Sequence, residues 1–133
     1  MLRSLEQDRA KYAMDRIREV KEKEFQKDYK SYAEEYKSYA EEYKSYVRRM
    51  PMLILTNGLG NALAFIKSKK NNKASDQFYT HLNKWLKEMM IISGDDVLNW
   101  ITDKNTSSIQ VQRATDEILA LLNWMKRFAE AEL

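Results

Sequence analysis

The sequence predicts an all-α protein, a compact bundle of about five helices in which the first helix is very long. Three glycines and one proline in 133 residues leave few positions for turns, which argues against sheets. Apolar residues recur at intervals of three and four through most of the chain, which is the spacing of one face of an α-helix. The length suits a single domain, residues 1–133, with a core of its own.

The first helix is expected over residues 4–49, because no glycine or proline interrupts this stretch. Ser4 is the predicted N-cap, and Glu6 lies in the first turn, where the helix dipole favours an acidic side chain. Pro51 disfavours the helical conformation at the residue before it and suits the first turn of a new helix. We therefore expect the helical body to occupy residues 51–133.

A repeated phrase occupies the middle of this first helix. Tyr-Lys-Ser-Tyr-Ala-Glu-Glu occurs twice in full from Tyr29 and begins a third time at Tyr43. The tyrosines follow alternating steps of three and four, as in a heptad seam: Tyr29, Tyr32, Tyr36, Tyr39, Tyr43 and Tyr46. Two-stranded coiled coils favour aliphatic residues at such positions, so packing on the chain's own helices or on a partner is favoured over a strict homodimeric zipper. A third interpretation is a spacer that, in whole heptads, keeps both ends of the helix in rotational phase.

The helices of the body are separated by polar loops. The first of them covers residues 51–70, where Gly58 and Gly60 would each cost about 1 kcal/mol unless a neighbouring helix approaches closely. Ser93 and Gly94 end the helix that follows. The predicted N-caps of the later helices are Ser75, then Asp95 or Asp96, then Ser107 or Ser108.

Basic residues are unevenly placed, although the formal net charge is only +3. No acidic residue occurs from Tyr43 to Ser75, so we expect a local positive field there. Four lysines within this stretch are the first candidates for contacts to nucleic-acid phosphates: Lys67, Lys69, Lys70 and Lys73. Arg48 and Arg49 come next, although a position in the last turn of the first helix would explain them equally well. Further candidates are Arg113, Lys126 and Arg127.

Residues that could carry catalysis are few. The one histidine, His81, has no carboxylate three or four residues away that would orient it as a general base. Asp95 and Asp96 are better explained as helix caps than as metal ligands, whereas Trp100 remains a candidate for base stacking. We therefore predict no catalytic residue, no metal and no other cofactor. The absence of cysteine and of an apolar run long enough to span a membrane favours a cytoplasmic protein.

Three segments carry a resemblance to a known family. They are "LEQDRAKYAMDRIREV" near the start, "MPMLILTNGLGNALAFIKSKK" from Met50 to Lys70, and "ATDEILALLNWMKRFAEAEL" from Ala114 to Leu133. Together they resemble the small subunit of the Cmr-type, type III-B CRISPR effector complex. The tyrosine array departs from the family's pattern, since about one such phrase is expected before the proline, and the extra units look like a tandem duplication.

The resemblance implies a small helical protein without catalytic residues. Members of the family stack as a filament beside the backbone subunits that hold the guide RNA, and they lie along the duplex of guide and target RNA. The implied partners are the backbone and large subunits, copies of the chain itself, guide RNA and target RNA, in antiviral defence. A helical module that self-associates through the tyrosine helix without contact to nucleic acid is the alternative.

Overall fold

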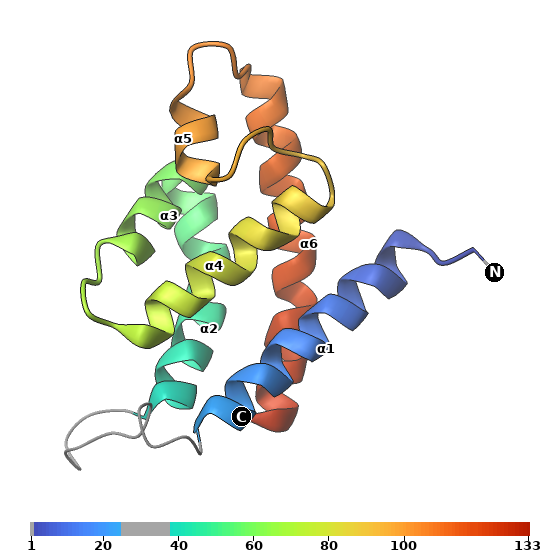
Figure 1. The fold of residues 1–133 in the computed structure, drawn as a ribbon, viewed down its shortest axis with the longest axis vertical. Coiled ribbons are helices and arrows are strands. Elements are labelled where there is room, and N and C mark those ends of the chain that lie inside the picture. Colours follow the sequence, from blue (N-terminus) through green and yellow to red (C-terminus); the bar gives the residue numbers. More distant parts are fainter. Residues whose placement is uncertain (1, 25–37) are drawn as a thin grey trace.

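The computed structural model describes residues 2–24 and 38–133. These residues form six helices and no strand, which confirms the predicted all-α class (Figure 1). The helices are α1 (Leu5–Glu24), α2 (Tyr39–Asn57), α3 (Leu59–Lys67), α4 (Lys73–Glu88), α5 (Val97–Thr102) and α6 (Ser108–Glu132).

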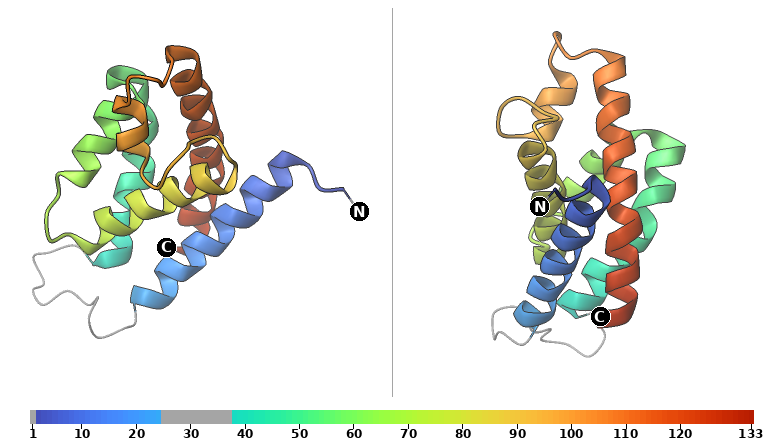
Figure 2. Two further views of the ribbon diagram at one scale, coloured as in Figure 1. Left: turned by 45° about the horizontal axis from the view of Figure 1, so that its top comes forward. Right: turned by 90° about the vertical axis from the view of Figure 1, so that its right-hand side faces the viewer.

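Helix α6, with 25 residues, lies between α1 and α2 and packs against both (Figures 1 and 2). Helix α4 packs mainly on α2, and the short α5 packs on α3. The core lies between these helices, and its largest fully buried side chains include Tyr43, Met50, Phe78, Leu82, Trp85, Ile118 and Leu121. The heptad and helical spacings of the sequence therefore correspond to faces that share one core.

The predicted long helix over residues 4–49 is wrong. Helix α1 ends at Glu24, and α2 begins behind Ser38, whose backbone is extended at φ −64° and ψ 163°. The Ser38 hydroxyl accepts a hydrogen bond from the backbone N–H of Glu41 at 3.1 Å, so Ser38 is a helix N-cap. The two helices pack against each other, which lets Ile17 of α1 and Tyr43 of α2 share one core. The repeat therefore cannot act as a spacer within a single helix, because residues 4–49 do not form one helix.

The expected helix boundary at Pro51 is also wrong, because α2 continues through Pro51 to Asn57. A proline inside a helix removes one backbone hydrogen bond and crowds the preceding turn. The core-facing residues on both sides of it, Met50 and Ile54, are almost fully buried, and their burial offsets this cost. Helix α2 ends instead at Gly58, whose φ of +86° favours glycine.

The close neighbour predicted for both Gly58 and Gly60 is confirmed at Gly60 only, since a Cβ atom at Gly58 would meet nothing within 4 Å. A Cβ atom at Gly60 would lie 3.3 Å from Cγ2 of Ile101 in α5, which is tighter than most such contacts. The absence of a side chain at Gly60 therefore allows α3 to approach α5.

The predicted helix caps have mixed outcomes. Ser4 is confirmed as a cap, since its hydroxyl accepts from the Gln7 N–H at 3.1 Å. Asp96 caps α5, and Ser107 forms a capping box with Gln110 at the start of α6. The cap predicted at Ser75 is wrong: Asn72 caps α4, and Ser75 is buried three residues further along, where its N–H donates to Asn72 Oδ1 at 2.9 Å.

Candidate nucleic-acid interface

Basic side chains from two separate parts of the chain line two adjoining surface hollows. Arg49 of α2 and Lys69 of the loop after α3 line the first hollow, together with Glu42, Ser45, Tyr46 and Asn72. Lys44, Arg48 and Arg49 line the second, together with Glu41, Ser45 and Leu133. Ser45 and Arg49 belong to both, so the hollows form one continuous surface. We call Lys44, Arg48, Arg49 and Lys69 the basic rim.

Helix α2 presents its part of the basic rim because the opposite side of the helix is buried. Tyr39, Tyr43, Tyr46 and Met50 follow one another at steps of three and four, and each is at most 6 % exposed. Val47, next to Tyr46, is buried as well, whereas Arg48 and Arg49 lie outside this buried face and are exposed. The tyrosine seam of the sequence therefore orients the basic residues of α2.

Asn72 brings the second part of the rim against α2. While its Oδ1 atom caps α4, its Nδ2 atom donates to Glu42 Oε2 at 2.6 Å. The Ser75 hydroxyl in turn donates to the backbone oxygen of Lys69 at 3.2 Å. These hydrogen bonds attach the loop between α3 and α4 to α2 and place Lys69 beside the same hollow as Arg49.

The four members of the basic rim form no ion pair with a carboxylate of residues 2–24 or 38–133 at 4.0 Å or less. Two of them lie over aromatic rings instead. The guanidinium carbon of Arg49 is 5.4 Å from the centroid of the Tyr46 ring, and Lys69 Nζ is 4.5 Å from the centroid of Phe65. Such contacts hold the side chains in position and leave their donors open to an anionic partner.

The remaining predicted phosphate contacts lie elsewhere. Lys67 Nζ is 3.8 Å from Asp96 Oδ1 and 4.9 Å from the centroid of the Tyr79 ring, so this lysine has partners inside the chain. Lys70 and Lys73 are exposed but do not line either hollow. The further candidates, which are exposed on α6 and also outside both hollows, are Arg113, Lys126 and Arg127.

Lys44 is the residue of the rim that sequence reasoning did not select. It is one of the seven basic residues of the acid-free stretch that could contact phosphates, but it is not among the preferred candidates. Its spacing of four residues from Arg48 places both on one side of a helix. This spacing is the sequence feature that could have identified Lys44 as a neighbour of Arg48.

The predicted self-association residues fall into two sets. Tyr39, Tyr43 and Tyr46 are buried in the core of this chain, and the latter two pack against Phe78 of α4, so these three do not form an exposed self-association surface. The other three lie outside the described residues: Tyr29, Tyr32 and Tyr36.

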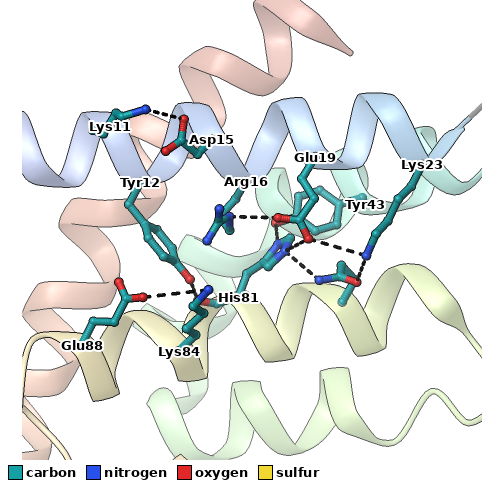
Figure 3. A network of polar contacts seen from close by, with 11 residues as sticks. Lys11, Tyr12, Asp15, Arg16, Glu19, Lys23, Tyr43, His81, Lys84 and Glu88 are labelled. Atoms are coloured by element: carbon teal, nitrogen blue, oxygen red, sulfur yellow. Dashed lines mark hydrogen bonds and ion pairs between the residues drawn. The ribbon is translucent and has the colours of Figure 1, made fainter.

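His81 lies at the centre of a buried polar group that links α1, α2 and α4 (Figure 3). Its Nδ1 atom is 2.6 Å from the hydroxyl of Tyr43, and its Nε2 atom is 2.7 Å from Gln77 Nε2. Glu19 of α1, which is far away in the sequence, lies 3.5 Å from the same Nε2 atom. Sequence spacing could not reveal this carboxylate. We call this group, Glu19, Tyr43, Gln77 and His81, the His81 cluster.

Burial keeps the His81 ring neutral. Removal from water lowers the pKa of His81 to about 4, although the neighbouring Glu19 acts in the opposite direction. Lys23 Nζ donates to Gln77 Oε1 at 2.7 Å, which turns the Gln77 amide N–H toward His81 Nε2 as a donor. The ring is only 2 % exposed, so it has no surface from which to reach a substrate.

Two other candidates have structural roles. Asp96 caps α5 by accepting from the Asn99 N–H at 3.0 Å, and it also accepts from the Tyr79 hydroxyl at 2.6 Å. These hydrogen bonds help hold the pKa of Asp96 below its ordinary value despite partial burial. Trp100 is 6 % exposed and belongs to the core, so its ring offers no stacking surface for a base. Within residues 2–24 and 38–133, no cluster of three or more His, Asp or Glu side chains could hold a metal ion.

The fold and the site define a small all-helical protein with one basic surface that the described chain leaves without acidic partners. The sequence model of the family described as CRISPR-associated protein (Cas_Cmr5) matches residues 5–132. The chain therefore belongs to the Cas_Cmr5 family, which confirms the resemblance found in the sequence.

A solved structure is similar over nearly the whole chain. The crystal structure of a CRISPR-associated Cmr5 family protein from Thermus thermophilus matches with a TM-score of 0.71 and 25% sequence identity. The match covers 99% of both chains. Membership of this family makes the chain a small subunit of a Cmr-type CRISPR complex, associated with other subunits of that complex. None of the helices in the described ranges has the length and apolar character needed to cross a membrane.

Proposed function

We propose that this chain is a non-catalytic structural subunit that contacts the backbone of the guide–target RNA duplex through its basic rim. One observation carries the proposal: four basic side chains from α2 and from the loop after α3 gather around adjoining hollows without an acidic partner in the described chain. Exposed cations that the protein does not neutralise attract phosphates, and release of counterions drives the association.

The same chemistry determines which features of the RNA this surface can recognise. A surface of guanidinium and ammonium groups recognises phosphates and gives no sequence information, so base pairing between guide and target supplies the specificity. Copies of the chain stack as a filament along the duplex, beside the backbone and large subunits of a type III-B complex, and serve antiviral defence in the cytoplasm. Cleavage of the target falls to other subunits.

Two observations support the non-catalytic role. His81, the one histidine, is sealed in the core with a pKa of about 4, too low for a general base that works near neutral pH. Asp96 is engaged as a helix cap. The alternative, a module that self-associates through the tyrosine helix, has no comparable support, because the described half of the seam is buried.

The test uses a reconstituted complex with its guide RNA. Replacing all four residues of the basic rim by glutamine is expected to weaken target RNA binding at least tenfold in a mobility-shift assay, because several phosphate contacts are lost together. The matched control replaces four exposed lysines outside both hollows, Lys11, Lys84, Lys87 and Lys104, which lowers the net charge equally. Equal affinities for the two variants would place the RNA on another surface.

A further inference from the structure

The first hollow contains an acid where phosphate binding alone would exclude one. Glu42, Ser45 and Arg49 follow each other on α2 at steps of three and four, so they form one stripe along the hollow. Lys69 and Asn72 form the opposite wall, and the space between is about 300 Å³. This is room for a phosphate group and the sugar attached to it.

Arg49 and Lys69 face the hollow from its two walls, on different elements of the fold. A phosphate between them would receive donors from both sides. Seven residues separate Glu42 from Arg49, about 10 Å along the helix axis. The carboxylate therefore lies toward one end of the hollow and the guanidinium toward the other.

Glu42 has one oxygen available for a partner. Its Oε2 atom accepts from Asn72 Nδ2 at 2.6 Å, and no other partner of the carboxylate is found among the described residues. The side chain is partly buried and held in place by this hydrogen bond. A fixed carboxylate near a phosphate site repels the phosphate, so it favours only a ligand that offers the carboxylate a hydrogen-bond donor.

A ribose offers such a donor. Its 2′-hydroxyl lies next to the 3′-phosphate on the same sugar, whereas a deoxyribose has no hydroxyl at that position. We propose that Glu42 accepts a hydrogen bond from a ribose 2′-hydroxyl whose neighbouring phosphate is held by Arg49 and Lys69, so that this hollow selects RNA over DNA. The inference rests on the proposed function, since it assigns the sugar to the same RNA surface.

The experiment compares nucleic acids of the same helical form. A 2′-fluoro strand keeps the A-form of RNA but lacks the hydroxyl donor, so it isolates the proposed hydrogen bond from helix shape. Complexes reconstituted with the wild-type chain or with Glu42→Gln are titrated with target, and the fluoro substitution is placed in the target strand and then in the guide strand. Glutamine is a suitable replacement because its amide oxygen can still accept from Asn72, and melting by circular dichroism checks that the fold is kept.

The expected result is a loss of discrimination. In one of the two strands, the preference of the wild-type complex for RNA over 2′-fluoro RNA shrinks about tenfold in Glu42→Gln, the effect of one charge-assisted hydrogen bond. Much of the change comes from tighter binding of the fluoro strand, because the variant no longer repels its phosphates. The control Asp76→Asn removes an exposed first-turn acid of α4 that does not line the hollow, and it leaves the preference unchanged.

Two outcomes would overturn the proposal in different ways. If the RNA preference is the same for wild type and Glu42→Gln with either strand substituted, Glu42 serves only to hold Asn72, and the basic rim can still bind phosphates. If the double variant Arg49→Gln, Lys69→Gln binds target RNA as tightly as wild type, the proposed function fails at this hollow and the inference fails with it.

Discussion

The His81 cluster and the basic rim both include residues of α2, but they differ in where their partners come from. The ring of His81 is bonded at Nδ1 by Tyr43 and at Nε2 by Gln77, each from within the chain. Two cations of the basic rim, Arg49 and Lys69, contact aromatic rings of the chain, and none of the four pairs with a carboxylate among the described residues. Groups with internal partners stabilise the fold, whereas exposed charges without them are available to another molecule.

This difference predicts that variants of the two regions separate stability from RNA binding. Changes inside the bundle are expected to lower the free energy of unfolding and leave the RNA surface intact in whatever protein remains folded. Changes in the basic rim are expected to weaken RNA binding and leave the free energy of unfolding nearly unchanged.

The largest loss of stability is expected from Glu117→Ala. Glu117 is 8 % exposed and accepts two hydrogen bonds from Arg9, at 2.7 and 2.9 Å, and a third from Trp85 Nε1 at 3.1 Å. Its removal leaves the Arg9 charge partly buried without its main partner, which costs about 3–5 kcal/mol. Chemical denaturation monitored by circular dichroism measures the loss.

The control for this prediction is Glu6→Ala. Glu6 also contacts Arg9, at 2.6 Å, but its side chain is exposed. Its loss should lower the stability far less than the loss of Glu117. Similar losses for the two variants would contradict the claim that the buried pair carries the stability.

The His81 cluster predicts that stability falls in mild acid. The pKa of His81 is about 4 in the folded protein and about 6.5 when the ring is exposed, so the unfolded state binds more protons between these values. The contribution of neutral His81 to the free energy of unfolding is therefore fully present above about pH 6.5. It falls as the pH drops toward 4, by at most about 3 kcal/mol. Glu19, whose pKa is lowered in the fold, adds a further loss below about pH 4.5.

Melting temperatures measured from pH 7.5 to 4.5 test this prediction. His81→Asn keeps a polar group in the cluster but has no titratable ring, so it should melt lower at neutral pH and lose most of the decline in this range. An equally steep decline in the variant would show that other groups cause the acid sensitivity.

The third prediction uses the tyrosine repeat to test the start of α2. Deleting Tyr36 to Glu42 removes one whole phrase, and the preceding phrase then supplies an identical sequence, with Ser31 in the place of the cap Ser38. Deleting only Tyr36 to Ala40 places Ala33 at the cap position instead. The second deletion should cost at least about 1 kcal/mol more than the first, because an alanine cannot cap the helix.

The shorter deletion also replaces a buried ring. Tyr39, which is 6 % exposed, gives way to Glu34 in the new register, so the loss should exceed that of the cap alone. Thermal melts of the two variants give the comparison. If both melt at the same temperature, neither the cap nor Tyr39 contributes to the stability of the fold.

The sequence predicted the fold class and much of the core, because helical spacing of apolar residues reports which faces are buried. It failed where a local rule competed with packing. Pro51 lies inside α2 because the buried Met50 and Ile54 on either side favour a continuous helix. The start of α2 at Ser38 was not predicted, although Ser-Tyr-Ala-Glu, a capping-box pattern, begins at this residue in the sequence.

The candidate site was predictable only in part. The acid-free stretch located the basic residues, and Arg48, Arg49 and Lys69 do line the hollows. The sequence could not predict which lysines lie beside α2. Their placement depends on a tertiary hydrogen bond between Asn72 and Glu42, thirty residues apart, which attaches the loop to α2. The same limit applies to the pairing of Lys67 with Asp96 and of His81 with Glu19.

The most direct test of the central claim is the salt dependence of target RNA binding by the reconstituted complex. Each lost phosphate contact reduces the slope of log affinity against log salt by about 0.7 to 0.9. For Arg49→Gln, Lys69→Gln, the account predicts a slope smaller than that of wild type by about 1.4 to 1.8 for each copy that contacts the RNA, with an unchanged melting temperature. The control Lys67→Gln, Lys84→Gln, in which both lysines have acidic partners in the chain, should keep the wild-type slope. A wild-type slope in the Arg49 and Lys69 variant would contradict the account.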